Sequence, residues 1–248
     1  MPGAPRLMGG LDPGVLVLVL LAVLLGAIVQ TVVGLGLGLV AAPVVTLLAP
    51  ELMPGVMISL ACVLPLLTLA GERRDIDWHG LGWSLPPRVL GTVIGVGVVA
   101  HFSEDQLGIL IGVIVLLAVL LTWRAITVPV NRGTLGTVGF ISGVTGTATS
   151  IGGPPFAILY QHRPARQIRT TMAVYFLVGA AISLVGLAIS GDLTRHQVAV
   201  GALLLPAVAV GAVVGVPLRR RLPGAVVRPA VLAVCGASAL VLVVRSLL

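Results

Sequence analysis

The sequence predicts an all-α polytopic membrane protein built from two inverted repeats, and three observations carry this prediction. The 248 residues are 58% hydrophobic and only 9% charged, whereas soluble domains carry roughly 25% charged residues. Apolar segments of about 20 residues, the length that a bilayer requires, alternate with short loops that contain arginine. A glycine-rich segment that ends in proline occurs once in each half of the chain, which indicates an internal duplication.

The most informative of these segments is 146–161, which reads GTATSIGGPPFAILYQ. A helix cannot continue through paired glycines and paired prolines, because glycine has a high entropic cost and proline lacks the N–H group. Lipid cannot satisfy the exposed backbone groups, so the break must face protein or a water-filled cavity. A helix that restarts at Pro154 or Pro155 directs its positive end into the break. The segment therefore predicts an anion-binding site inside the membrane.

Residues 1–13 form an N-terminal tail, residues 14–124 the first repeat, residues 125–133 a cytoplasmic linker and residues 134–248 the second repeat. Each repeat is expected to contain a pair of short or broken helices followed by three full spans, which gives about 8–10 membrane segments. Whether the short pairs are re-entrant or cross the bilayer stays open. The expected apolar segments of the first repeat are 14–33, 44–49 after the break, 53–71, 81–101 and 107–123. Those of the second repeat are 134–145, a short run that ends at Tyr160, 170–190, 198–218 and 226–244.

The repeat can be checked by counting. Segments 34–43 and 146–155 have ten residues each, begin with glycine, end with proline and are separated by 112 positions (146 minus 34). Further along the chain, three correspondences share a separation of 120 positions: Pro86 with Pro206, Gly91 with Gly211 and Gly95 with Gly215. The order and spacing of these residues, rather than overall identity, predict the duplication.

The arginines predict the orientation. All fifteen basic residues are arginine, and eleven of them fall in loops 72–80, 124–132, 162–169 and 219–228, whereas the opposite side keeps three. Positive loops face the cytoplasm, so both termini are expected outside a bacterial cell membrane. Because five segments per repeat is an odd number, the second copy must be inverted. Inverted repeats whose broken helices meet near the midplane are typical of secondary transporters.

Substrate contacts are expected where the two breaks lie. The candidates are backbone or polar groups in or next to the breaks, together with one arginine within a span: Gln30, Thr31, Gly34, Gly36, Gly38, Arg88, Thr147, Thr149, Ser150, Gly152, Gly153 and Pro154. Helix N-termini and hydroxyl groups are suited to an anion that must also be released.

Two simpler interpretations stay open for these residues. The glycines can serve only to let helices pack closely, and each hydroxyl can bond to its own helix. Arg88 lies about 10 Å into its span, counting 1.5 Å per residue from Leu81. A charge at that depth is functional by default, but its long side chain can also extend to the cytoplasmic interface.

At these motifs the chain resembles the sulfite exporter TauE/SafE family of membrane transporters. The resemblance rests on GLGLGLVAAPVVTLL (34–48), ERRDIDW (72–78), SIGGPPFAILYQ (150–161) and IRTTMAVYFLV (168–178). It implies export of a small sulfur-containing anion such as sulfite or a sulfonate, for example sulfoacetate. The first motif departs from the triple-glycine form common in the family, since Gly34, Gly36 and Gly38 alternate with leucine.

Other functional classes lack support in the sequence. No nucleophile with a neighbouring base, metal-ligand cluster or deep pair of carboxylates points to an enzyme, so no cofactor or metal is expected. The arginines lie between apolar spans, which argues for membrane topology and against nucleic-acid binding. An anion channel and an importer of another small organic anion stay open as alternatives, as do proton coupling and a homodimer. No Asp or Glu lies deep in any span.

Overall fold

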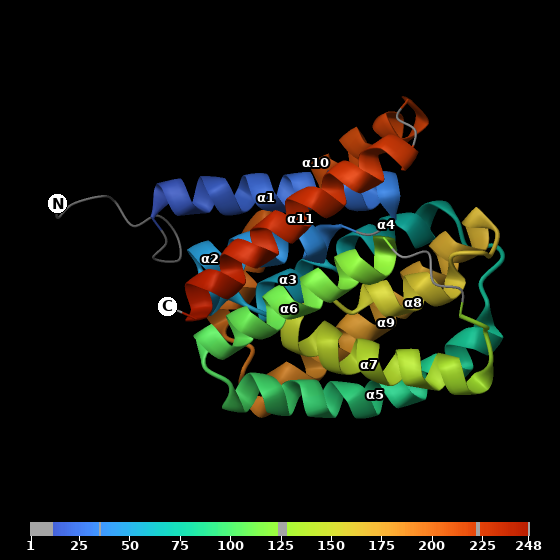
Figure 1. Ribbon diagram of the computed structural model, residues 1–248, viewed down its shortest axis with the longest axis horizontal. Coiled ribbons are helices and arrows are strands. Elements are labelled where there is room, and N and C mark those ends of the chain that lie inside the picture. Colours follow the sequence, from blue (N-terminus) through green and yellow to red (C-terminus); the bar gives the residue numbers. More distant parts are fainter. Residues whose placement is uncertain (1–11, 35, 124–127, 222–223, 248) are drawn as a thin grey trace.

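The structure is a computed structural model that describes residues 12–34, 36–123, 128–221 and 224–247. Within these ranges it is built from helices and contains no strand (Figure 1). The elements in chain order are α1 (Pro13–Val33), the π-helical turn η1 (Leu37–Ala41), α2 (Ala42–Leu48), the 3-10 turn η2 (Pro50–Leu52), α3 (Gly55–Leu60), α4 (Val63–Gly71), α5 (Trp78–His101), α6 (Glu104–Trp123), α7 (Arg132–Thr149), α8 (Gly153–Tyr160), α9 (Ala165–Ser190), α10 (Arg195–Arg221) and α11 (Gly224–Leu247).

The helices have the length and surface of a multi-pass membrane protein. Among the described residues, five helices are long and apolar enough to cross a bilayer, namely α1, α5, α6, α9 and α10. Large apolar side chains are exposed on their outer surfaces, including Leu90 at 65%, Val93 at 67% and Ile189 at 82%. Apolar surface of this extent is unfavourable in water and favourable in lipid. The prediction of an all-α polytopic membrane protein is confirmed.

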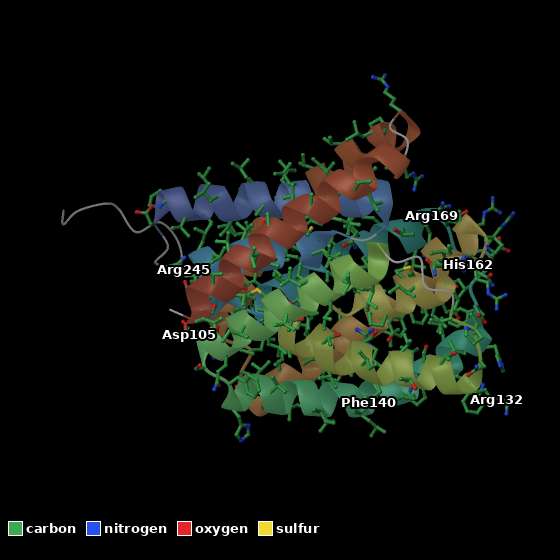
Figure 2. The ribbon with its side chains drawn as sticks, viewed as in Figure 1. Asp105, Arg132, Phe140, His162, Arg169 and Arg245 are labelled. Atoms are coloured by element: carbon green, nitrogen blue, oxygen red, sulfur yellow. The ribbon has the colours of Figure 1, made fainter. Side chains whose placement is uncertain are left out.

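The polar side chains that Figure 2 labels lie at the two ends of the helix bundle. Arg132, His162 and Arg169 lie at one end, and Asp105 and Arg245 lie at the other (Figure 2). We name the first the arginine end; the α4–α5 and α8–α9 connections lie there, and α10 ends there (Figure 1). We name the second the terminal end, because α1 begins and α11 ends at this side of the bundle (Figure 1).

The first break follows α1. Gly34 ends this helix in the left-handed conformation with φ 92°, and its N–H donates to the carbonyl of Gln30. Gly36 precedes η1, and Pro43 lies in the first turn of α2. The chain therefore reverses inside the bundle instead of continuing as one span.

The second break follows α7 and is shorter than the 146–155 segment. The helix continues to Thr149, and Ser150 then takes the left-handed conformation with φ 63°. Helix α8 begins at Gly153 with prolines in its first turn, as the sequence predicted. Non-glycine residues seldom adopt this conformation, so Ser150 marks a backbone position that the surrounding structure must enforce.

The expected single span 53–71 is two helices, α3 and α4, separated by a turn at Ala61 and Cys62. Pro65 explains the interruption, because it lacks the N–H that would bond to the carbonyl four residues earlier. By contrast, α5 continues through Pro86 and Pro87. Proline alone therefore did not identify which apolar segment would divide.

Corresponding glycines pack against corresponding helices in the two halves. Helix α5 packs on α7, and α10 packs on α1. A Cβ atom at Gly91 of α5 would overlap the carbonyl of Phe140, while one at Gly211 of α10 would lie 2.6 Å from the Cβ of Ala27. These pairs are those expected if α1–α6 and α7–α11 are copies related by a two-fold axis. They support the inverted repeat, which stays a prediction.

We predict that Gly91→Ala destabilises the protein, whereas Gly97→Ala on the same helix does not. A Cβ at Gly91 meets backbone of α7, while no atom lies within 4 Å of a Cβ at Gly97. Forcing an extra methyl group into packed helices costs about 1–3 kcal/mol. Thermal unfolding in detergent measures both variants, and equal midpoints would contradict the close α5–α7 packing.

Candidate functional site

The two broken segments touch at the centre of the molecule. A Cβ atom at Gly38, in η1, would lie 2.8 Å from the carbonyl oxygen of Ser150 and 3.3 Å from Cγ1 of Ile151. Only glycine allows the first break to approach the backbone of the second this closely. Segments more than 100 residues apart in sequence thus form one site.

A cavity of about 70 Å³, which we name the central cavity, lies between these segments. One water needs only about 10–15 Å³ measured in this way, so the space holds several waters or one small anion. Its lining combines both breaks with residues of α3, α5, α7 and α9: Gln30, Gly36, Leu37, Gly38, Leu39, Met57, Ile58, Ala61, Arg88, Gly146, Ser150, Ile151, Gly152, Gly153, Pro154, Phe176, Ala180 and Ser183.

Arg88 extends from the middle of α5 into this lining and is only 4% exposed. Its Nε and Nη1 atoms are buried and form no hydrogen bond with any residue that the structure describes. Its Cζ atom lies 4.4 Å from the ring centroid of Tyr175 on α9. A Cβ atom at Gly179, one turn further along α9, would overlap the guanidinium. The missing side chain at Gly179 therefore provides the space that Arg88 occupies.

Among the described residues, the charge of Arg88 has no acidic partner. The ion pairs found among the described residues join Arg166 and Arg169 to Glu72, and Arg166 to Asp75. Removing an unpaired charge from water destabilises the folded protein by several kcal/mol after relaxation. The cation–π contact with Tyr175 offsets about 2 kcal/mol of this cost. An anion in the central cavity would offset the remaining cost, which makes this position chemically suited to anion binding.

Helix α8 adds positive potential to the same cavity. Pro154 and Pro155 lack N–H groups, so the free donors at the start of α8 are those of Gly152 and Gly153. No side chain caps this helix, and both glycines line the cavity. The helix end contributes roughly half a positive charge, which adds to that of Arg88.

Gln30 connects the first break to the cavity. Its Oε1 accepts a hydrogen bond of 3.0 Å from the N–H of Leu37, which is the first residue of η1. The side chain thus replaces a backbone acceptor that the broken helix lacks. For its Nε2 we find no bond to any described residue, and the side chain lines the cavity, so this donor is available to a ligand.

A larger cavity of about 590 Å³, which we name the vestibule, reaches the arginine end, where the exposed Arg219 and the partly exposed Arg169 line it. Gln30 and Phe176 line both the vestibule and the central cavity. The two spaces therefore meet at these side chains.

Glu72 at the vestibule is held by arginines of α9. Arg169 donates a 2.6 Å hydrogen bond to it, and Arg166 lies 2.8 Å away. The hydrogen bond from Arg169 and the positive charges of Arg169 and Arg166 hold the pKa of Glu72 below its usual range. Glu72 therefore remains ionised and paired at neutral pH, and these ion pairs are lost only as pH falls through that lowered pKa.

The structure brings together most of the predicted site residues. Gln30, Gly36, Gly38, Arg88, Ser150, Gly152, Gly153 and Pro154 line the central cavity. Thr31 and Gly34 line the vestibule instead, and the Thr31 hydroxyl donates to the carbonyl of Ala27. Arg88 lies in the interior rather than reaching the interface.

Two predicted threonines bond elsewhere. Thr147 Oγ1 lies 2.7 Å from Ser183 Oγ, and Thr149 Oγ1 donates to the carbonyl of Thr145 over 2.7 Å. Both threonines are fully buried and neither is part of the cavity lining. Their hydroxyls follow the simpler interpretation, in which Ser and Thr bond within or between helices. We do not carry them into the proposed site.

Sequence reasoning missed the contribution of α9. Phe176 and Ser183 line the central cavity, and Tyr175 and Gly179 enclose the guanidinium of Arg88. Tyr175 also has a core contact, because its ring stacks on that of Phe156 with centroids 4.0 Å apart. The spacing of Tyr175 and Gly179 by four residues places them on one helix face, but this signal alone does not identify Arg88 as their partner.

We predict that Gly152→Leu abolishes transport while the protein still inserts into the membrane. A Cβ here would lie 2.8 Å from the carbonyl of Ser142 and 3.0 Å from the Cα of Gly146, so the leucine side chain must displace the break. Gly82→Leu is the control, because no atom lies within 4 Å of its Cβ. Flux into proteoliposomes measures both variants, and wild-type flux in Gly152→Leu would contradict a central site.

Comparison with known proteins agrees with this architecture. The family model described as Sulfite exporter TauE/SafE matches residues 18–242, which is nearly the whole chain. No curated protein matches the chain. No solved structure matches it either. The match covers both breaks, Arg88 and all of α9, and the chain therefore belongs to the sulfite exporter TauE/SafE family of membrane transporters.

Proposed function

We propose that this transporter exports a small sulfur-containing anion, sulfite or an organosulfonate such as sulfoacetate, through the central cavity. The observation that carries the proposal is Arg88, a buried cation that has no acidic partner in the described part of the chain and lines a cavity between two broken helices. The family supplies the sulfur chemistry, and Arg88 with the α8 end supplies the positive potential that an oxyanion needs. The proposed ligand groups are Arg88, Gln30 and the backbone of Gly152 and Gly153.

Alternating access is the proposed mechanism, and the two cavities support it. The vestibule reaches the arginine end, so an anion can approach Gln30 and Phe176 from that side. Towards the terminal end, Ser150 Oγ donates 3.1 Å to the carbonyl of Pro54, and Gln197 Nε2 donates to the carbonyl of Met53. Release on that side requires these bonds to break as one repeat moves against the other.

We propose a bacterial cell membrane with the arginine end in the cytoplasm. Export then runs from the vestibule to the terminal end, and both termini are extracytoplasmic. A phosphatase reporter that is active only outside the cytoplasm is expected to be active when fused at either terminus. Green fluorescent protein, by contrast, becomes fluorescent when it is fused on the cytoplasmic side. Fluorescence from fusions at both termini would contradict this orientation.

The experiment that tests the function is ligand binding to purified protein. We expect sulfite or an anionic sulfonate to stabilise the protein against heat more than acetate does, and more than taurine, whose ammonium group cancels its sulfonate charge, at equal concentration and ionic strength. If none of the sulfur anions raises the unfolding temperature, the proposal that this chain transports a sulfur anion is wrong. Counterflow in proteoliposomes then separates a carrier, which shows accelerated exchange and saturation, from a channel, which shows neither.

A further inference from the structure

The central cavity carries a single full charge. Of the described residues that line it, Arg88 is the one with a charged side chain. The rest of the lining is glycine, three uncharged polar groups and a large apolar surface that includes Leu37, Met57 and Phe176. The positive end of α8 adds about half a charge. The electrostatics of the cavity therefore match one negative charge much better than two.

Titratable groups near Arg88 do not change this balance. Helix α5 packs against α7 and α9. From α9, Tyr175 faces the guanidinium. From α7, Gly146 lies beside it, where a Cβ atom would lie 3.4 Å from Nη2. At the vestibule, Glu72 pairs with Arg169, and Arg219, which also lines this space, is exposed.

We infer that the site accepts singly charged anions and rejects doubly charged ones, so that sulfite is carried as hydrogensulfite. This inference rests on the proposed function and narrows it to the monoanionic members of the sulfur oxyanions and sulfonates. It excludes sulfoacetate, whose sulfonate and carboxylate groups are both ionised at neutral pH. A second negative charge would have to leave water for a lining without a second cation, at a cost of several kcal/mol. The proton then crosses the membrane on the substrate, and a carboxylate within the spans is not needed to carry it.

Three inorganic and organic probes test the inference by calorimetry on the purified full chain. Methanesulfonate has one charge throughout the neutral range, sulfate has two, and sulfite changes from one to two near neutral pH. We expect methanesulfonate to bind with the same Kd at every pH and sulfate to bind at least about 100-fold more weakly. The Kd for total sulfite is expected to rise about tenfold per pH unit once the dianion predominates, since only the remaining monoanion fraction binds.

The outcomes separate the inference from the proposed function. A Kd for sulfate within about tenfold of the Kd for methanesulfonate would overturn the charge selection. A Kd for sulfite that does not change with pH would overturn it too. Both results would leave the proposal of sulfur-anion transport in place. Failure of both methanesulfonate and sulfite to bind at any pH would overturn the proposed function itself. Methanesulfonate serves as the control for pH effects on the protein.

Loss of its binding in Arg88→Gln assigns the signal to the central cavity, and retained binding would place the selection elsewhere and contradict the inference.

Discussion

Arg88→Gln is expected to abolish measurable binding of the sulfur anion and its transport. The substitution removes the only full charge that the described lining offers. Truncating one partner of a buried charged pair costs about 2–5 kcal/mol, which corresponds to a loss of affinity of roughly 30-fold to several thousand-fold. Calorimetry on the purified protein and flux into proteoliposomes measure the two effects. Arg195→Gln is the control, because Arg195 is exposed at the start of α10.

Stability shows whether Arg88 acts in binding or only in packing. Replacing an unpaired buried charge with an apolar side chain of similar volume is often neutral or stabilising. We therefore expect Arg88→Met to unfold at the same temperature as the wild-type protein or a higher one when no anion is present, and to gain nothing from added anion. A large loss of stability in Arg88→Met together with unchanged anion binding would assign Arg88 a structural role.

Gly179→Ala is expected to disable the site without removing any charge. The new methyl group would overlap the guanidinium of Arg88 and no other group approaches it more closely. The obstacle is the far end of a flexible side chain, so Arg88 moves and the fold is kept. Its contact with Tyr175 and its position in the central cavity are then lost. We expect a loss of affinity approaching that of Arg88→Gln, measured by the same calorimetry.

Two controls define this result. Gly97→Ala introduces the same methyl group where no atom lies within 4 Å, so its affinity and stability are expected to equal those of the wild-type protein. The double variant Gly179→Ala with Arg88→Gln is expected to bind no more weakly than Arg88→Gln alone, because both changes remove one interaction. Wild-type affinity in Gly179→Ala would show that the guanidinium does not need its observed position.

Backbone chemistry explains why much of this architecture could be predicted. Glycine pairs and proline pairs restrict the chain so strongly that the breaks near Gly36 and Gly152 could be placed from residue types alone. A charge in an apolar span is costly, so Arg88 stood out among the fifteen arginines. The shared separation of Gly91 from Gly211 and of Gly95 from Gly215 likewise predicted the duplication from the sequence alone.

The remaining features depend on contacts between distant segments. The depth of Arg88 fitted both a cavity and an interfacial position, and Tyr175 with Gly179 on α9 determines which one the side chain takes. A hydroxyl can bond to its own helix or to a ligand, and the sequence does not distinguish these choices for Thr149. Local pattern also did not predict that residues 53–71 form two helices, since both parts are equally apolar.

The measurement that tests the central claim most directly is an experimental structure with a bound anion. Crystals grown with bromomethanesulfonate, which has one charge and an anomalous scatterer, locate the ligand without ambiguity. We predict an anomalous bromine peak in the central cavity, with the sulfonate against the guanidinium of Arg88 and the N–H groups of Gly152 and Gly153. A fully occupied peak elsewhere, with only water between the two breaks, would contradict the account.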